Sequence, residues 1–297
     1  MNFLSKKDIV FPKRSPDSHK GENGVVLAVG GSAEYPGAIG LASLAALRSG
    51  ADLVRVAAPE KVAWVLNTYS PDLITIKLKG RSITTKHLPL IAKYLEHSCV
   101  LLLGNGIGRS AETKAACRKL ASFPCLKVID ADALRAASLQ NTDNSILTPH
   151  IRELEALLTN SKIKSSAIKN IANEKNVEKR AKLIQHATKH CIKNNFIIVK
   201  GEIDTIISKK SIYYNKTGNP GMTRGGTGDV LAGLCAGFLA QSLELGQSAI
   251  NATYINGMVG DILLKKKKGY FFLASDMVEE IKRVAKIPRN TKGLTLN

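Results

Sequence analysis

The chain of 297 residues has few aromatic side chains, which make up 5% of it and include a single tryptophan. That share fits an aliphatic α/β core better than an aromatic-rich β-sandwich. No apolar run approaches the roughly 18 residues needed to span a bilayer, and the start, MNFLSKKDIV, has too few apolar residues for a signal peptide. We therefore expect a soluble, cytoplasmic protein with no membrane partner.

Paired cysteines are missing as well. The five cysteines lie far apart and form no CxxC pair: Cys99, Cys117, Cys125, Cys191 and Cys235. An odd, unpatterned set indicates reduced thiols and argues against a disulfide framework or a zinc site.

Acidic residues are few, 24 against 43 basic ones, so the formal net charge is +19. The basic residues concentrate in 160–195 and 265–268 without the interleaved aromatics of a nucleic-acid surface. Glu178 and Lys182 stand at i,i+4 spacing, which is typical of a solvated helix face. We expect no nucleic-acid partner, although the same field would attract a phosphate-bearing substrate.

Short apolar runs alternate with helical patterns along most of the chain. A helix is expected over 38–50, and strand-like runs lie at 24–32, 53–59, 99–106, 126–134 and 196–208, the last as a hairpin. This alternation predicts βαβ units and a parallel sheet in one domain, residues 1–297. The Lys- and Asn-rich segment 159–180 is the best candidate for a mobile excursion.

Glycine-rich or polar segments follow many of these strands: GGSAEYPGA, GNGIG, DADAL, TPHIRE, KGEIDT and GGTGD. Ligands of open α/β sheets bind beyond the carboxyl ends of the strands. The segments are therefore expected to line one cleft.

The segment GGTGD opens an apolar helical run. Gly225, Gly226 and Gly228 can adopt positive φ and bring bare backbone close to a ligand. The free N–H groups and the dipole of the helix then favour a phosphate or a developing oxyanion. Asp229 either caps the helix or acts as a general base beside the anion. The glycine run favours the base, because a cap needs no such run.

GGTGDVLAG resembles the anion-hole signature of ribokinase-like small-molecule kinases. With KGENGVVLAVGGSAEYPGAIGLASLAALRSGADLV, LLLGNGIG, VIDADAL, LTPHIREL, VKGEIDTI and NPGMTR in the same order, nearly the whole chain resembles the ADP/ATP-dependent NAD(P)H-hydrate dehydratases, in the form without the epimerase domain. The resemblance implies an α/β, ribokinase-like fold with a central, mostly parallel sheet and helices on both faces.

The resemblance implies repair of nicotinamide cofactors. The S form of NADHX or NADPHX would be phosphorylated on its ring hydroxyl by ADP (ATP in some members), with Mg²⁺, and would then lose phosphate to restore NADH or NADPH. ADP would give AMP. It also implies a homo-oligomer, with a tetramer among the assemblies expected. The choice between ADP and ATP, and between the two hydrates, stays open.

The resemblance also assigns site residues. Asp229 would take the hydroxyl proton, while the N–H groups of Gly226, Thr227 and Gly228 would form the anion hole. The substrate would contact Ala38, Gly106, His150 and Asp229. The nucleotide would contact Lys200, Gly201, Glu202, Ile203, Asp204 and Gly228.

Several positions keep two interpretations. Glu153 organises the water shell of a metal or caps a helix. Asp130 and Asp132 hold Mg²⁺ through water, or Asp132 is only a cap. Lys200 meets a phosphate or is a solvated hairpin lysine. Arg224 is a second phosphate clamp or an outward-facing loop charge.

Three residues depart from the family pattern, which usually has proline at Asn105, glycine at Arg152 and a small residue at Arg224. Two other functions remain open. One is a ribokinase-like kinase of a small alcohol, such as a thiamine or pyridoxal precursor, and the other is an inactive basic binding protein. His150 favours the dehydratase, because related thiamine-pathway kinases tend to have asparagine there.

Overall fold

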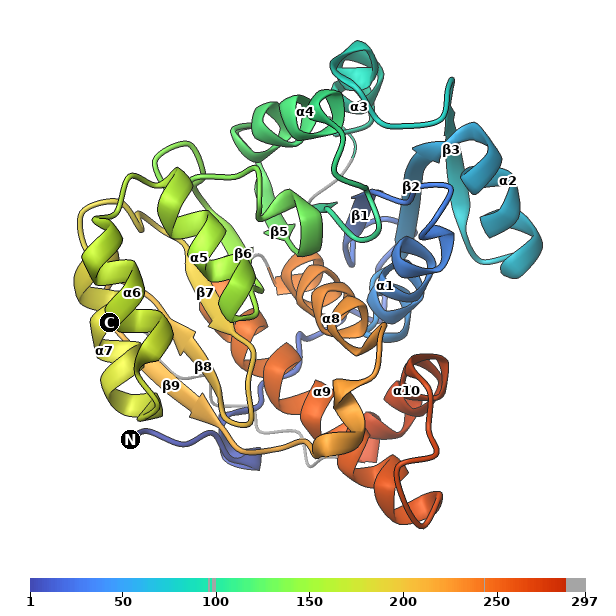
Figure 1. Cartoon of the computed structure of the whole chain (residues 1–297). Coiled ribbons are helices and arrows are strands. Elements are labelled where there is room, and N and C mark those ends of the chain that lie inside the picture. The colour runs from blue at the N-terminus through green and yellow to red at the C-terminus, as the bar shows by residue number, and fades with distance from the viewer. Residues whose placement is uncertain (96, 98–99, 243, 287–297) are drawn as a thin grey trace.

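A computed structural model describes residues 1–95, 97, 100–242 and 244–286 (Figure 1). One sheet of nine strands runs through the molecule. Its strands are β1 (Val25–Val29), β2 (Leu53–Pro59), β3 (Ile74–Leu78), β4 (Val100–Leu103), β5 (Leu126–Ile129), β6 (Ser145–Leu147), β7 (Phe196–Val199), β8 (Asp204–Ile207) and β9 (Ile212–Asn215). Cys99 lies outside the described residues, and the other four cysteines are free thiols.

The strand order is β3-β2-β1-β4-β5-β6-β7-β8-β9. Neighbours from β3 to β7 pair in parallel, and only β7-β8 and β8-β9 are antiparallel. Parallel strands point in the same direction, so the carboxyl ends of β1, β4, β5, β6 and β7 meet at one edge of the sheet. This edge collects the loops that the sequence predicts for the cleft.

Helices cover both faces of the sheet (Figure 1). They are α1 (Pro36–Arg48), α2 (Glu60–Tyr69), α3 (Leu88–Leu95), α4 (Ala111–Ala121), α5 (Ile151–Asn160), α6 (Ser165–Asn173), α7 (Val177–Thr188), α8 (Thr227–Ser242), α9 (Leu245–Lys266) and α10 (Ala274–Glu280). Short 3₁₀ turns lie at Lys6–Asp8, Thr85–His87, Ala131–Ala133, Pro220–Thr223 and Ile281–Lys286. In the part of the chain that the structure describes, no helix combines the length and apolarity needed to cross a membrane.

Strand β1 shows how the two cores arise. Its five residues are all buried, so both of its faces are covered. Val26 and Ala28 point to the core formed with α1, α2, α8, α9 and α10, whereas Leu27 and Val29 point to the core formed with α3 to α7. The predicted α/β architecture with helices on both faces is confirmed.

Helices α1 and α8 pack face to face beside the sheet (Figure 1). Gly233 and Gly237 of α8 lie against the backbone of α1, and a Cβ at either position would overlap the carbonyl of Ala42 or Ala46. Glycine therefore permits a backbone approach that alanine would prevent. This packing places the N-terminus of α8 at the carboxyl edge of the strands.

The predicted elements agree with the structure apart from their ends and one segment. The helix predicted over 38–50 is α1, and the predicted hairpin is β7-β8. The segment 159–180, predicted as a mobile excursion, instead contains α6 and the start of α7. Ile171, Ala181 and Ile184 are fully buried in the core, because the charged pattern leaves one apolar stripe on each helix.

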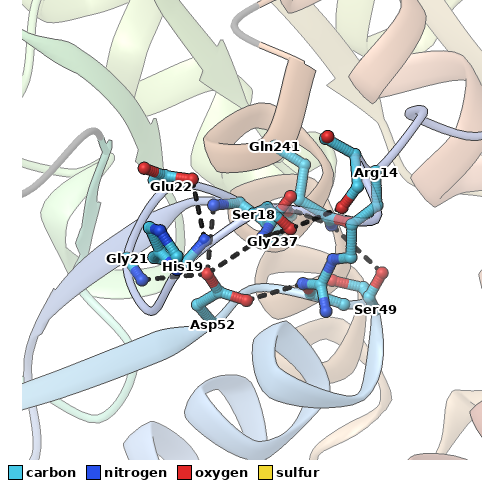
Figure 2. A network of polar contacts seen from close by, with 12 residues as sticks. Arg14, Ser18, His19, Gly21, Glu22, Ser49, Asp52, Gly237 and Gln241 are labelled. Carbon is cyan, nitrogen blue, oxygen red and sulfur yellow. Dashed lines mark hydrogen bonds and ion pairs between the residues drawn. The ribbon is translucent and has the colours of Figure 1, made fainter.

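A polar network ties the N-terminal segment to the start of β2 (Figure 2). Asp52 accepts hydrogen bonds from Arg14 Nη2 at 2.6 Å, from Gly21 N at 2.9 Å and from Asn23 N at 3.0 Å. Burial alone would raise the pKa of Asp52, but the hydrogen bonds from Asn23 and Gly21 and the charge of Arg14 hold it below its ordinary value. Nearby, Gln241 of α8 donates a hydrogen bond to Ser49 O, which links the C-terminal ends of α1 and α8.

Replacing Asp52 with alanine should lower the free energy of unfolding by about 2 kcal/mol at pH 7, because several charge-assisted hydrogen bonds are lost. The folded pKa lies below the ordinary value of 3.8. The contribution is therefore present above that value and is lost as the pH falls through the folded pKa. Urea unfolding at pH 7 and under acid conditions measures both effects. The exposed Asp17→Ala is the control, and equal losses in the two variants would contradict the prediction.

Candidate active site

The loops at the carboxyl edge of the sheet bring together side chains from five parts of the chain. Asn105 follows β4, Asp130 follows β5 and Lys200 follows β7, while His150 caps the N-terminus of α5 and Asp229 lies in the first turn of α8. Hydrogen bonds link Asp229 to Asn105, Asn105 to Asp130, and Asp130 to Lys200. The loops that the sequence predicts to line one cleft therefore contribute to one connected polar cluster.

The glycine bend, residues 225–228, leads into α8. Gly226 has a φ of 95°, and a Cβ there would lie 2.7 Å from Ala274 Cβ and 2.8 Å from Leu41 Cδ1. Both facts require glycine. Thr227 uses its hydroxyl to bind Met222 O at 2.7 Å, which holds the bend in place.

The first amides of α8 are available to a ligand. Within the described residues, no acceptor contacts the N–H groups of Gly228 and Asp229, whereas Thr227 N makes only a long bond of 3.5 Å to Arg224 O. Lys200 Nζ lies beside Gly228, where a Cβ would come within 3.4 Å of it. Unpaired amides, a helix dipole and an ammonium group together favour an anion at this point.

Asp229 does not cap its own helix. Its Oδ1 accepts a hydrogen bond from Asn105 Nδ2 at 2.7 Å, and no backbone N–H in the described chain donates to its carboxylate. Burial and the nearby charge of Asp130 raise the pKa of Asp229 to about 7, although Asn105 and Lys200 act in the opposite direction. Its carboxylate can therefore exchange a proton near neutral pH.

Asp130 is the anchor of the cluster. It is 2% exposed, and its Oδ1 accepts from Thr148 Oγ1 at 2.7 Å and from Lys200 Nζ at 3.0 Å. Burial alone would lower the pKa of Lys200, but Asp130 and Glu153 outweigh it and raise the pKa. Lys200 is thus a charged ammonium paired with Asp130 and Glu153 inside the polar cluster, and not a solvated hairpin lysine.

Glu153 caps helix α5. Its Oε2 accepts from His150 N at 3.0 Å, while its Oε1 lies 3.3 Å from His150 Nε2. His150 Nδ1 accepts from Arg152 N at 3.1 Å, so the ring proton belongs on Nε2. Burial lowers the pKa of His150, and Lys200 and Arg135 lower it further, which makes a neutral imidazole at pH 7. The ring is 43% exposed and can still reach a ligand.

The acidic residues do not form a metal cage. Asp132 pairs with Arg109 at 2.6 Å, and Asp130 is occupied by Lys200. No group of three His, Cys, Asp or Glu side chains suited to a metal occurs within the described ranges. The predicted water-mediated pair Asp130 and Asp132 is therefore already bound to cations. Any Mg²⁺ here would arrive with the phosphates of a nucleotide, since Mg²⁺ readily keeps its waters and uses few protein ligands.

The remaining predicted residues fall into two groups. Gly106 has a φ of 65°, and a Cβ there would lie 3.0 Å from Ala38 Cβ, so these two predicted substrate contacts lie side by side. At the β7-β8 turn, Gly201 N donates to Asp204 Oδ1 at 3.0 Å. Burial raises the pKa of Asp204 to about 6. Ile203 packs against the core, whereas Glu202 is exposed.

Arg224 lies at the edge of the glycine bend. Its Nη2 donates to Tyr270 O at 3.0 Å, so the predicted phosphate clamp is tied to a neighbouring loop in this structure. Arg224 and Gly225 also line a cavity of about 390 Å³ between α1, α2 and the start of α10. Its other walls are Pro36, Gly37, Leu41, Val65, Leu66, Tyr69, Leu273, Ala274 and Ser275. The glycine bend therefore separates this apolar cavity from the polar cluster.

The sequence assigns no site role to two members of the cluster, Asn105 and Thr148. Asn105 stands out only as a replacement for a usual proline, and Thr148 only as part of TPHIRE. Both side chains are fully buried. Both stand just after a strand, inside the segments GNGIG and TPHIRE, and this was the available signal, but only the fold shows that they contact carboxylates 25 and 18 residues away.

Comparison with known proteins agrees with this geometry. The sequence profile of the family described as NAD(P)H-hydrate dehydratase matches residues 26–283. The chain is 38% identical over 290 residues to the bifunctional NAD(P)H-hydrate repair enzyme Nnr of Methanothermobacter thermautotrophicus, covering 95% of this chain but 54% of that longer protein. It therefore spans about half the length of such relatives.

A relative of the same length is also found. The chain is 34% identical to the ADP-dependent (S)-NAD(P)H-hydrate dehydratase of Nitrosopumilus maritimus, over 95% of both chains. Two solved structures share the fold. A ribokinase-like superfamily protein of Enterococcus faecalis has a TM-score of 0.80 at 25% identity over 97% of both chains. An ADP/ATP-dependent NAD(P)H-hydrate dehydratase of Bacillus subtilis has a TM-score of 0.74 at 23% identity, over 96% of this chain and 98% of that one.

Asp229→Asn should change stability in a pH-dependent way. The folded pKa of about 7 lies above the ordinary 3.8. The folded state therefore binds the extra proton, and wild-type stability falls as the pH rises between these values. Asparagine is free of this penalty. The melting temperature of the variant should exceed that of the wild type above pH 7, and the difference should shrink towards pH 4. A difference that is constant with pH would contradict the raised pKa.

Proposed function

The chain belongs to the NAD(P)H-hydrate dehydratase family, and from this membership we propose that it restores damaged nicotinamide cofactors. The reaction is the dehydration of the S form of hydrated NADH or NADPH, with ADP as co-substrate and AMP and phosphate as products. The observation that supports it most is the buried carboxylate of Asp229, which has a pKa near 7 and lies beside unpaired helix amides. A relative of the same length is named an ADP-dependent enzyme.

The first step is phosphoryl transfer. Asp229 accepts the proton of the ring hydroxyl as that oxygen attacks the terminal phosphorus of ADP, and AMP leaves. The N–H groups of Gly226, Thr227 and Gly228 bind the oxygens of the transferring group, and Lys200 adds a positive charge next to Gly228. The requirement is mainly placement and charge, which a rigid glycine bend supplies.

The second step is loss of phosphate. Hydroxide is a poor leaving group and phosphate is a good one, so the C–O bond breaks with its electron pair leaving on phosphate while the ring nitrogen donates electrons to that carbon. Loss of a proton from the neighbouring ring carbon, to phosphate or water, then forms the new carbon–carbon double bond. In this proposal Ala38 and Gly106, which lie side by side, and His150 would contact the hydrated ring. The neutral imidazole of His150 can donate a hydrogen bond from Nε2 without adding a charge there.

In this proposal the nucleotide and the hydrated ring bind on opposite sides of the glycine bend. The turn that follows Lys200, residues 201–204, would contact it, and Mg²⁺ would enter bound to its phosphates. The Bacillus subtilis structure was obtained with ATP and Mg²⁺. Glu153 would contact this metal only through water, because both of its oxygens already serve His150.

The kinase alternative has less support. Hydroxyethylthiazole kinase of Pyrococcus horikoshii shares only the fold with this chain, at 12% identity. A kinase and a dehydratase would share the anion hole and the base, and differ in the substrate wall. Histidine at position 150, where related thiamine-pathway kinases tend to have asparagine, favours the dehydratase.

Purified protein given ADP, Mg²⁺ and hydrated NADH should regain the absorbance of the reduced nicotinamide ring. Asp229→Asn should lower kcat by about 10²- to 10⁴-fold, the range for removing a general base, while its fold and nucleotide binding persist. The exposed Asp72→Asn is the matched control. If the wild type leaves the hydrate unchanged with both ADP and ATP, the dehydratase proposal fails.

We also propose a homo-oligomer, in the cytoplasm, built from single-domain chains. Several apolar side chains around the 390 Å³ cavity are about half exposed: Val65 at 52%, Tyr69 at 58% and Leu273 at 53%. Trp64 and Phe271 are exposed close to them in sequence. A chain poor in aromatic residues that leaves its single tryptophan on the surface presents a patch suited to a second copy.

Tyr69→Asp should shift the protein towards the monomer, because a charge cannot be buried there without a partner. Light scattering coupled to size exclusion measures the mass. Leu183→Asp, on the surface of α7, is the control and should leave the mass unchanged. A wild type that is monomeric at all accessible concentrations would contradict this part of the proposal.

A further inference from the structure

Asn105 occupies an unusual place in the cluster. Its side chain is fully buried, and its amide nitrogen donates to two carboxylates at once, Asp130 Oδ2 at 2.9 Å and Asp229 Oδ1 at 2.7 Å. Both hydrogens of the amide are thereby used. The orientation of the amide is fixed, since turning it would place its oxygen against two carboxylates.

The other end of the amide is left without a partner. Asn105 Oδ1 is buried, and no donor in the described part of the chain reaches it. A buried acceptor without a donor costs stability. The fold alone gives no reason to keep such a group at this point. The hydrogen bonds of the amide nitrogen give such a reason, because one of the two carboxylates that accept them is Asp229, the candidate base.

The backbone of Asn105 is held as firmly as its side chain. Gly31 N donates to Asn105 O at 2.9 Å, and a Cβ on Gly30 would lie 2.5 Å from the same oxygen. Asp130 is fixed by Thr148 and Lys200. The Asn105 amide therefore links the fixed carboxylate of Asp130 to the carboxylate of Asp229, which must accept the proton.

Three charged side chains and one amide act on the Asp229 carboxylate, each from a different part of the fold. Asp130 after β5 and Glu153 on α5 disfavour its charged form, whereas Lys200 after β7 and Asn105 after β4 favour it. Lys200 bonds to Asp130 directly and meets Asp229 only through space. Asn105 is therefore the one side chain among the described residues that donates a hydrogen bond to Asp229.

We propose that Asn105 is a positioning residue that aims the Asp229 carboxylate at the substrate hydroxyl and keeps it ionised beside Asp130. The inference rests on the proposed function, since it assigns a second residue to that chemistry. Without the amide, two like charges face each other across a buried gap and Asp229 takes up a proton. Its oxygen also loses the contact that sets its direction.

The test compares two buried asparagines. Asn105→Leu keeps the approximate shape of the side chain but removes both donors. Asn195→Leu is the matched control, because Asn195 is 1% exposed and its amide binds Ser145 N and Thr142 O at the opposite edge of the sheet. Both variants lose hydrogen bonds in a core. Only the first removes the donor from Asp229.

The readout is the titration of the Asp229 carboxyl carbon by ¹³C NMR, with its resonance identified by its loss in Asp229→Asn. Asn105→Leu should raise the midpoint by about one pH unit or more, and Asn195→Leu should leave it unchanged. Asn105→Ser retains one donor and should give a smaller upward shift, which keeps the test usable if the leucine variant does not fold. Unchanged midpoints in the Asn105 variants, or an equal shift in the control, would overturn the proposal.

This measurement needs no substrate. A protein that fails to restore hydrated NADH would refute the proposed function and leave the titration result standing. In an active enzyme, Asn105→Leu should lower kcat at pH 7 by about fivefold, because a one-unit rise from a pKa of about 7 lowers the ionised fraction of the base from about one half to about one eleventh, with a smaller effect on KM. A lowered kcat with no shift of the Asp229 titration would show a merely structural role and would contradict the inference.

Discussion

The close packing of helix α8 on helix α1 is the constraint from which the site follows. Gly233 and Gly237 let the two backbones touch, and this fixes where α8 begins. The helix then starts at the carboxyl edge of five parallel strands, with its free amides turned towards their loops. A bulkier contact would displace the glycine bend and separate Asp229 from Asn105, which come from elements 124 residues apart.

At the carboxyl edge of the sheet, ion pairs and hydrogen bonds balance the charged side chains, and solvent does not. Asp130 and Glu153 share Lys200, and Asp132 pairs with Arg109. Among the residues that the structure describes, Asp229 receives a hydrogen bond only from the Asn105 amide. The carboxylate with the weakest pairing is thus the one whose pKa reaches about 7. Groups poised near the working pH are typical of catalytic bases, whereas fully paired carboxylates serve structure.

Much of the fold could be predicted from the sequence, because alternating apolar runs and glycine stops are local signals. Strands β1, β4 and β7 and helix α1 carry such signals clearly. Segment 159–180 was misjudged because its charges concealed a narrow apolar stripe, which only packing on the sheet makes evident. The sequence places the candidate site residues in motifs but leaves Glu153 as either a cap or a metal contact, and the cap is evident only from the hydrogen bond that His150 N donates to it.

The links between motifs could not be predicted. That Lys200 pairs with Asp130, and that Asn105 joins Asp130 to Asp229, depends on strand order, and strand order is not encoded in any one segment. The sequence predicts a glycine bend at the start of a helix, but it does not predict which residues pack against that bend. Gly226 lies against Ala274 and Leu41, and this contact explains why the bend cannot accept a side chain.

The account depends on a carboxylate that loses its proton near neutrality beside a helix-borne anion site. The most direct measurement is the pH dependence of kcat/KM for hydrated NADH with saturating ADP. The account predicts a rate that rises with pH along one ionisation and reaches half of its plateau near the value of about 7 given for Asp229. A rate that is constant from about pH 5.5 to 9, more than one unit on either side of that value, would contradict it.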